Sequence, residues 1–134
     1  MNPNYPLVAE RAGHRCEYCH APEAPFNLPF EVEHIIPRSK GGIDDESNWA
    51  LACRRCNLRK HDYTDGIDPL TQERVPLFDP RRNIWHEHFE VRREKPYLIE
   101  GKTAIGRVTI ERLDMNAEEQ IEAREVWSNL KLFP

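Results

Sequence analysis

The chain has 134 residues and a net charge of −4, with 39% hydrophobic and 31% charged residues. This length predicts one domain, or one core with an appendage, and the composition is ordinary for a globular protein. The overall charge does not indicate a nucleic-acid-binding protein, and no apolar run approaches the roughly 18 residues that a membrane span needs.

The N-terminal segment, MNPNYPLVAERAGHRC, does not place a basic stretch before an apolar core, so we expect no secretory signal. The predicted location is the cytoplasm, with no membrane partner. In that reducing compartment, the four cysteines are not expected to form disulfides.

The first predicted element is a short helix over residues 5–12. Asn4 can cap it, Pro6 falls in its first turn and Gly13 can end it. The proline-rich stretch 21–29 predicts a loop.

A strand is predicted over 30–36, with Phe30, Val32 and His34 on one face and the intervening residues on the other. A loop with two glycines follows over 37–47. The sequence NWALA at 48–52 predicts a second strand, and a basic helix is expected from Cys53 to about His61.

The remainder is less regular. Residues 65–82 are rich in turn formers and allow a short hairpin, whereas 84–91 and 97–100 look like strands. A helix capped by Thr103 is predicted over 103–113, and another over 116–132 with Asn116 and Glu119 as a capping box. That last helix has apolar residues at helical spacing: Ala123, Val126, Trp127 and Leu130.

The cysteines form two CxxC pairs, CEYC at 16–19 and CRRC at 53–56. Two such turns that meet in space make a closed tetrahedral zinc site from Cys16, Cys19, Cys53 and Cys56. Four buried free cysteines are the simplest alternative. CEYCH also matches a c-type haem attachment pattern, and CxxC a redox motif, but neither alternative uses both pairs.

We call the two CxxC turns knuckles. Residues 31–62, EVEHIIPRSKGGIDDESNWALACRRCNLRKHD, place in order an acid–histidine pair, a loop, an asparagine, a strand, the second CxxC turn, an asparagine and a cationic helix. This order resembles the HNH endonuclease family, in the subgroup whose core is held between two CxxC knuckles. The resemblance covers about residues 11–62 and implies an α+β fold: a ββα-metal core with a C-terminal strand and helix extension.

The resemblance also implies roles. His34 matches the general base, Glu33 the acid that binds the catalytic divalent metal, and Asn48 the asparagine that braces the loop. Asn57 stands where the family usually has its last histidine, as a metal ligand in an HNN variant, and His61 is an added imidazole that could join the metal or a phosphate. These roles suit phosphodiester hydrolysis, because an imidazole can accept a proton near neutral pH and a hard cation can stabilise the leaving oxygen.

Positive charges cluster beside the histidine. The expected DNA contacts are Arg38, Lys40, Arg54, Arg55, Arg59 and Lys60. Each of these cations alone is more simply a solvated surface charge.

The sequence therefore predicts a DNA endonuclease with a structural zinc and a catalytic Mg²⁺ or Mn²⁺. Residues 1–62 are expected to form the nuclease core and 63–134 an extension packed on it, which leaves a homodimer open. A catalytically silent zinc-dependent nucleic-acid-binding module is the first alternative, and a protein-interaction zinc module the second. His86 and His88 have the spacing of a second metal pair, although packing is the simpler explanation.

Overall fold

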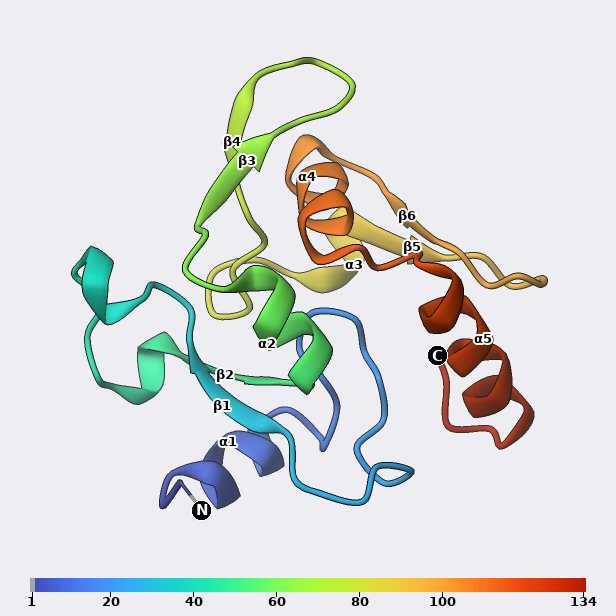
Figure 1. Cartoon of the computed structure of the whole chain (residues 1–134), viewed down its shortest axis with the longest axis horizontal. Coiled ribbons are helices and arrows are strands. Elements are labelled where there is room, and N and C mark those ends of the chain that lie inside the picture. Colours follow the sequence, from blue (N-terminus) through green and yellow to red (C-terminus); the bar gives the residue numbers. More distant parts are fainter. Residues whose placement is uncertain (1) are drawn as a thin grey trace. The chain divides into compact units, whose positions relative to one another are not determined.

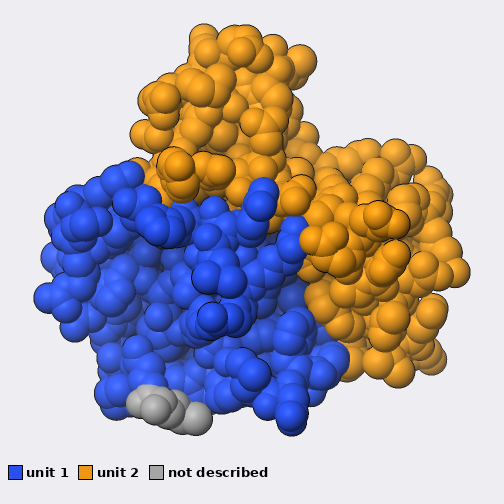
Figure 2. All heavy atoms as spheres, viewed as in Figure 1, with its two compact units in different colours: residues 1–62, 79–82 blue, residues 63–78, 83–134 orange. Residues whose placement is uncertain are grey.

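The protein has an α+β fold, as predicted, in a computed structural model that describes residues 2–134. Within those residues it contains three two-stranded antiparallel sheets and five α-helices (Figure 1). The chain divides into two compact units, coloured separately in Figure 2: Met1–Asp62 with Asp79–Arg82, and Tyr63–Phe78 with Asn83–Pro134. None of the helices in residues 2–134 has the length and apolar character needed to cross a membrane.

The first unit contains a β-hairpin followed directly by a helix (Figure 1). β1 (Glu31–His34) pairs antiparallel with β2 (Trp49–Ala52), which places His34 opposite Trp49. α2 (Arg54–Lys60) begins after Cys53, whose sulfur accepts a hydrogen bond from the Cys56 N–H as the helix cap. α1 (Tyr5–Arg11) packs against the same hairpin. Residues 31–60 thus have the predicted ββα order.

The predicted loop over 21–29 is held at its base by Glu23. This buried carboxylate accepts hydrogen bonds from the Phe30 N–H and the Tyr5 hydroxyl, and contacts His14 Nδ1, each at 2.7 Å. Burial alone raises the pKa of Glu23, but the hydrogen bond from Phe30 and those from His14 and Tyr5 lower it overall. The ionised carboxylate therefore ties α1 to the start of β1.

The second unit contains two hairpins and three helices: β3 (Asp65–Ile67), β4 (Arg74–Pro76), α3 (Trp85–His88), β5 (Phe89–Val91), β6 (Ile99–Gly101), α4 (Ala104–Leu113) and α5 (Glu118–Asn129). The Thr103 side chain accepts a hydrogen bond from the Gly106 N–H and caps α4, as predicted. A Cβ on Gly106 would lie 2.0 Å from the His88 carbonyl oxygen, so this helix requires glycine where it approaches α3.

An aromatic cluster forms part of the core of the second unit. The ring of Phe89 lies 4.9 Å from that of Trp85 and 5.3 Å from that of Phe78. The strand predicted over 84–91 is wrong in its first half, because Trp85 and Phe89 are buried on one side at helical spacing. His88 contacts the Thr103 hydroxyl at 2.6 Å and His86 is exposed, which is the arrangement expected from packing.

The C-terminal helix differs from its prediction in start and in face. It begins at Glu118, and Asn116 does not cap it, because its side chain bonds to the backbone of Ile99. Of the predicted apolar stripe, Trp127 is buried, but Val126 and Leu130 are 56% and 59% exposed, so the prediction is wrong for these two residues. The buried face instead contains Arg124, which donates to the Asn116 side chain.

Candidate metal centre and active site

Four cysteine side chains meet in the interior of the first unit. They come from the two predicted knuckles, their sulfur atoms all lie within 4.8 Å of one another, and none forms a disulfide: Cys16, Cys19, Cys53 and Cys56. The ligand sulfurs of a tetrahedral zinc ion lie about 3.8 Å apart, given Zn–S bonds of about 2.3 Å. The Cys19 and Cys53 sulfurs are 3.8 Å apart. The buried four-sulfur donor set therefore fits a structural zinc ion.

The close packing of the four thiols also affects their protonation. Hydrogen bonds with the thiols of Cys16, Cys19 and Cys53 raise the pKa of Cys56 well above its usual range. Thiols packed this closely resist ionisation on their own, and a bound cation stabilises the thiolate forms. Because both CxxC turns converge on one point, the cluster favours metal over the haem and redox alternatives.

His34 lies at the end of β1, where its imidazole meets a carboxylate from the following loop. The Nε2 atom lies 2.9 Å from Asp44 Oδ1, and the same oxygen accepts a hydrogen bond of 3.2 Å from the Trp49 indole. The hydrogen bond with His34 lowers the pKa of Asp44, so this carboxylate is ionised at neutral pH. The sequence prediction did not include Asp44, because acids at 44, 45 and 46 are equivalent until the loop is folded.

Asn48 holds the loop that follows His34. Its side-chain amide donates to the carbonyls of Ile36 and Ile43, each at 2.9 Å, and accepts from the Ile36 N–H at 2.9 Å. Gly42, a residue of this loop, packs so closely on the start of the loop that a Cβ would lie 1.7 Å from the Ile36 carbonyl oxygen. The asparagine and the glycine thus fix the loop between β1 and β2.

One pocket of about 300 Å³ brings the predicted site residues together. Its lining combines an acid, two imidazoles, an amide and a guanidinium with two apolar residues: Val32, Glu33, His34, Pro37, Arg38, Asn57 and His61. Asn48 is not among them, since its side chain bonds within the loop. The chain therefore collects a candidate base and candidate oxygen ligands around one small opening.

Comparison with protein families gives a match to the same segment. A family model described as HNH endonuclease matches residues 16–63. This segment belongs to the HNH endonuclease family. The match spans both knuckles, β1, β2 and α2, which confirms the resemblance inferred from the motifs and indicates nuclease activity in general. No curated protein and no solved structure matches the chain.

Within the HNH segment, Glu33 and Lys60 form a buried ion pair. Their side chains are 4% and 1% exposed, and Lys60 Nζ lies 3.4 Å from Glu33 Oε2. Lys60 also donates to the Ile35 carbonyl at 2.8 Å, and Glu33 accepts from the Tyr18 hydroxyl. Burial raises the pKa of Glu33, which Lys60 opposes. We expected Lys60 among the DNA contacts, but its ammonium group is instead enclosed by protein.

Asn57 is held by a second carboxylate of the HNH segment that the sequence prediction did not include. Its amide donates to Glu31 Oε2 at 2.6 Å, and Arg54 donates to Glu31 Oε1 at 2.9 Å. This contact fixes the orientation of the Asn57 amide, whose oxygen is the atom able to bind a cation. An acid one strand repeat before Glu33 was a signal for this contact, since alternate residues of a strand share a face.

The other predicted DNA contacts of the HNH segment lie at or near the surface. Arg38 and Arg54 have 70% and 68% exposed side chains, Lys40 and Arg59 are exposed, and Arg55 is half-buried. Arg38 lies 4.0 Å from Asp44, beside His34. Positive charge is thus present around the pocket although the whole chain is acidic.

Proposed function

We propose that the protein is a metal-dependent endonuclease that hydrolyses phosphodiester bonds in DNA, with His34 as the general base. The observation that carries the proposal is the single pocket that His34 shares with Glu33, Asn57, His61 and Arg38. A binding module alone requires none of these groups in one opening.

His34 accepts the proton of the attacking water. An imidazole suits this step because it gains and loses protons near neutral pH. Asp44, 2.9 Å from Nε2, orients the ring and stabilises its protonated form, as a carboxylate does beside a catalytic histidine. Asn48 acts as a positioning residue, because it holds the loop that carries Asp44.

The pocket also offers hard oxygen ligands for Mg²⁺ or Mn²⁺. Glu33 and Asn57 would hold the ion, with His61 as an additional ligand. Such a cation, when bound, stabilises negative charge on the leaving 3′ oxygen. A small number of protein ligands is enough for this role, because Mg²⁺ keeps water and phosphate in its other coordination positions. A carboxylate has about four acceptor sites, so the contacts of Glu33 with Lys60 and Tyr18 do not exhaust its capacity.

DNA is the proposed substrate because the exposed cations lie on the same unit as the pocket. Arg38 lines the pocket itself, and Arg54 and Arg59 belong to α2. Such cations bind phosphates through charge, and this binding weakens as the salt concentration rises.

Plasmid nicking by the zinc-loaded protein tests the proposal. Nicking is expected with Mg²⁺ or Mn²⁺ and not with EDTA. His34→Ala is expected to lower the rate by roughly 10²- to 10⁴-fold with DNA affinity unchanged in fluorescence anisotropy. His86→Ala, an exposed histidine of the second unit, is the matched control and retains full activity.

The result distinguishes the alternatives. Equal nicking by wild type and His34→Ala removes His34 as the base. Binding of DNA without nicking by the wild type in any divalent metal supports the catalytically silent module instead. Circular dichroism and zinc content confirm that each variant is folded.

A further inference from the structure

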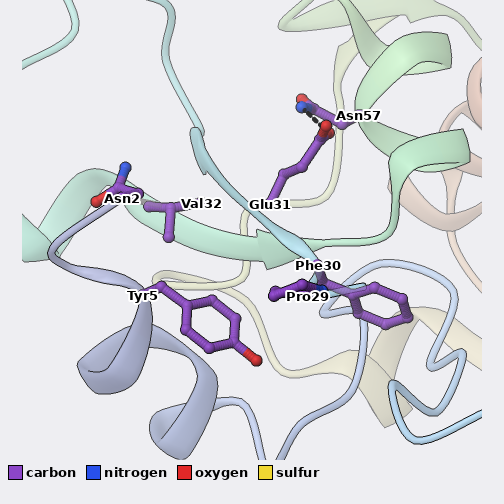
Figure 3. Close-up of a pocket in the computed structure, with 7 residues that line it drawn as sticks. All are labelled: Asn2, Tyr5, Pro29, Phe30, Glu31, Val32 and Asn57. Carbon is purple, nitrogen blue, oxygen red and sulfur yellow. Dashed lines mark hydrogen bonds between the residues drawn. The ribbon is translucent and has the colours of Figure 1, made fainter. Parts of the chain in front are cut away.

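A second pocket lies along β1, beside the one that contains His34. It has a volume of about 490 Å³, within the range of about 300–1,000 Å³ typical of small-molecule sites. We call it the edge pocket, and Figure 3 shows the seven residues that line it: Asn2, Tyr5, Pro29, Phe30, Glu31, Val32 and Asn57. Val32 and Asn57 line both pockets, so the two share a wall.

We infer that the edge pocket binds the base of a nucleotide next to the scissile phosphodiester, and that it selects bases with an exocyclic amino group. The inference rests on the proposed nuclease function, because that function places a phosphate in the pocket of His34. The next nucleotide along the strand then reaches the shared wall formed by Val32 and Asn57.

One side of the edge pocket is suited to stacking on Tyr5 and Pro29, behind which Phe30 is buried. Figure 3 shows the rings of Tyr5, Pro29 and Phe30 on one side of β1, away from Asn57. The Tyr5 hydroxyl, at the far end of its ring, donates to Glu23 at 2.7 Å. Nucleobases stack on such rings whatever their sequence, because every base has a flat apolar face.

The other side of the edge pocket can discriminate between bases. The Glu31 carboxylate reaches toward Asn57 in Figure 3 and accepts hydrogen bonds from Asn57 and Arg54. These two donors orient the carboxylate and offset its repulsion of phosphates, and further acceptor sites remain. An acceptor attracts the amino group of cytosine or adenine and repels the carbonyl that thymine has in the same place.

The backbone of β1 adds a second set of polar groups. Ile35 donates its N–H to Asn48 across the hairpin, and the register then directs the N–H and C=O of Val32 away from β2. A donor and an acceptor on one residue can pair with the edge of a base. The pocket thus combines stacking with directional hydrogen bonds, which an apolar cleft alone lacks.

The test uses the His34→Ala protein, so that binding is measured without cleavage. Oligonucleotides of about twelve nucleotides, all dC or all dT, are titrated by fluorescence anisotropy. The dC strand is expected to bind about 10-fold more tightly. Glu31→Gln should bring the two affinities within about 2-fold, because a glutamine amide donates as well as accepts. Glu10→Gln, an exposed acid of α1 with the same charge change, should leave the ratio unchanged.

Two variants of Tyr5 test the stacking side of the edge pocket. Tyr5→Leu should weaken binding of both strands by about 10-fold, whereas Tyr5→Phe keeps the ring and should bind as the parent does. Equal affinity for dC and dT in the parent overturns the inference, and so does a ratio that Glu31→Gln leaves unchanged. If the ratio behaves as expected but the wild type never nicks plasmid DNA, the nuclease proposal fails and base selection stands.

Discussion

The buried pair of Glu33 and Lys60 predicts that Lys60→Met strongly destabilises the first unit. With side chains 4% and 1% exposed, the pair is far from the exposed limit, where a salt bridge contributes about 0–1 kcal/mol. Removing one partner of a buried pair costs about 3–5 kcal/mol, because the other charge stays buried without compensation. That is a large part of the roughly 5–15 kcal/mol that stabilises a typical domain.

The same variant should have a distinctive pH dependence. Burial already raises the pKa of Glu33, and Lys60 is the largest influence that lowers it. In Lys60→Met the pKa of Glu33 should therefore be raised further. A carboxyl with a raised pKa in the folded state binds more protons there than in the unfolded state. The free energy of unfolding then falls as the pH rises above the pKa of this glutamate in the unfolded state, about 4.3. Lys60→Met should therefore lose more stability at pH 8 than at pH 5.

Urea unfolding of the zinc-loaded protein, followed by circular dichroism, measures both effects. Lys40→Met is the control: Lys40 is exposed, and its replacement should change the unfolding free energy by less than about 0.5 kcal/mol. Replacing both Lys60 and Glu33, by methionine and glutamine, should restore at least half of the loss, since no lone charge remains. A Lys60→Met protein within about 1 kcal/mol of the wild type at both pH values refutes the reasoning.

Four other expectations follow from the structure. Cys53→Ser should lower zinc content in elemental analysis and unfold the first unit, because a structural zinc contributes folding energy directly; a variant that melts like the wild type without zinc contradicts the knuckle assignment. Asn48→Ala should cost roughly 1–3 kcal/mol in urea unfolding and slow nicking at unchanged DNA affinity; equal nicking argues against a positioning role. Asp44→Asn should lower kcat roughly 10- to 100-fold with little change in KM, and an unchanged kcat removes Asp44 from the mechanism. Hydrogen bonds from Arg107 lower the pKa of buried Asp68, so this carboxylate stabilises the second unit above about pH 4 and less as the pH falls; Asp68→Asn should flatten the fall in melting temperature below pH 4.

The sequence predicted best where spacing alone determines contact. Two CxxC turns in one chain most simply bind one common metal ion, so the cysteine cluster could be predicted from the sequence, as could the ββα order. Local chemistry also predicted the cap at Thr103. These features depend on residues that lie close in sequence or that bind one common ion.

Side-chain direction in short elements was harder to predict. β1 has only four residues, and its predicted alternation separated Val32 from Glu33 without deciding which face is buried; in the structure Glu33 is buried and Val32 is half-buried. A lysine seven residues into a basic run looks like a phosphate contact, and only the packing of α2 on β1 turns Lys60 inward. In α5 the buried face contains Arg124, whose partners Tyr97 and Asn116 both lie outside the helix. Such partnerships have no local signature.

The position of His34 depends on contacts from three directions, and these connect it to the cysteine cluster. Lys60 binds the residues on both sides of His34, through the Glu33 carboxylate and the Ile35 carbonyl, and Asn48 holds the loop beyond. Lys60 is the last residue of a seven-residue helix, which is far shorter than the 12–15 residues that an isolated helix needs to be even marginally stable. The cysteine cluster holds the N-terminal end of that helix through Cys53 and Cys56. A metal ion bound by the four cysteines would thus support α2, which places Lys60, and Lys60 contacts the end of the strand that carries the proposed base.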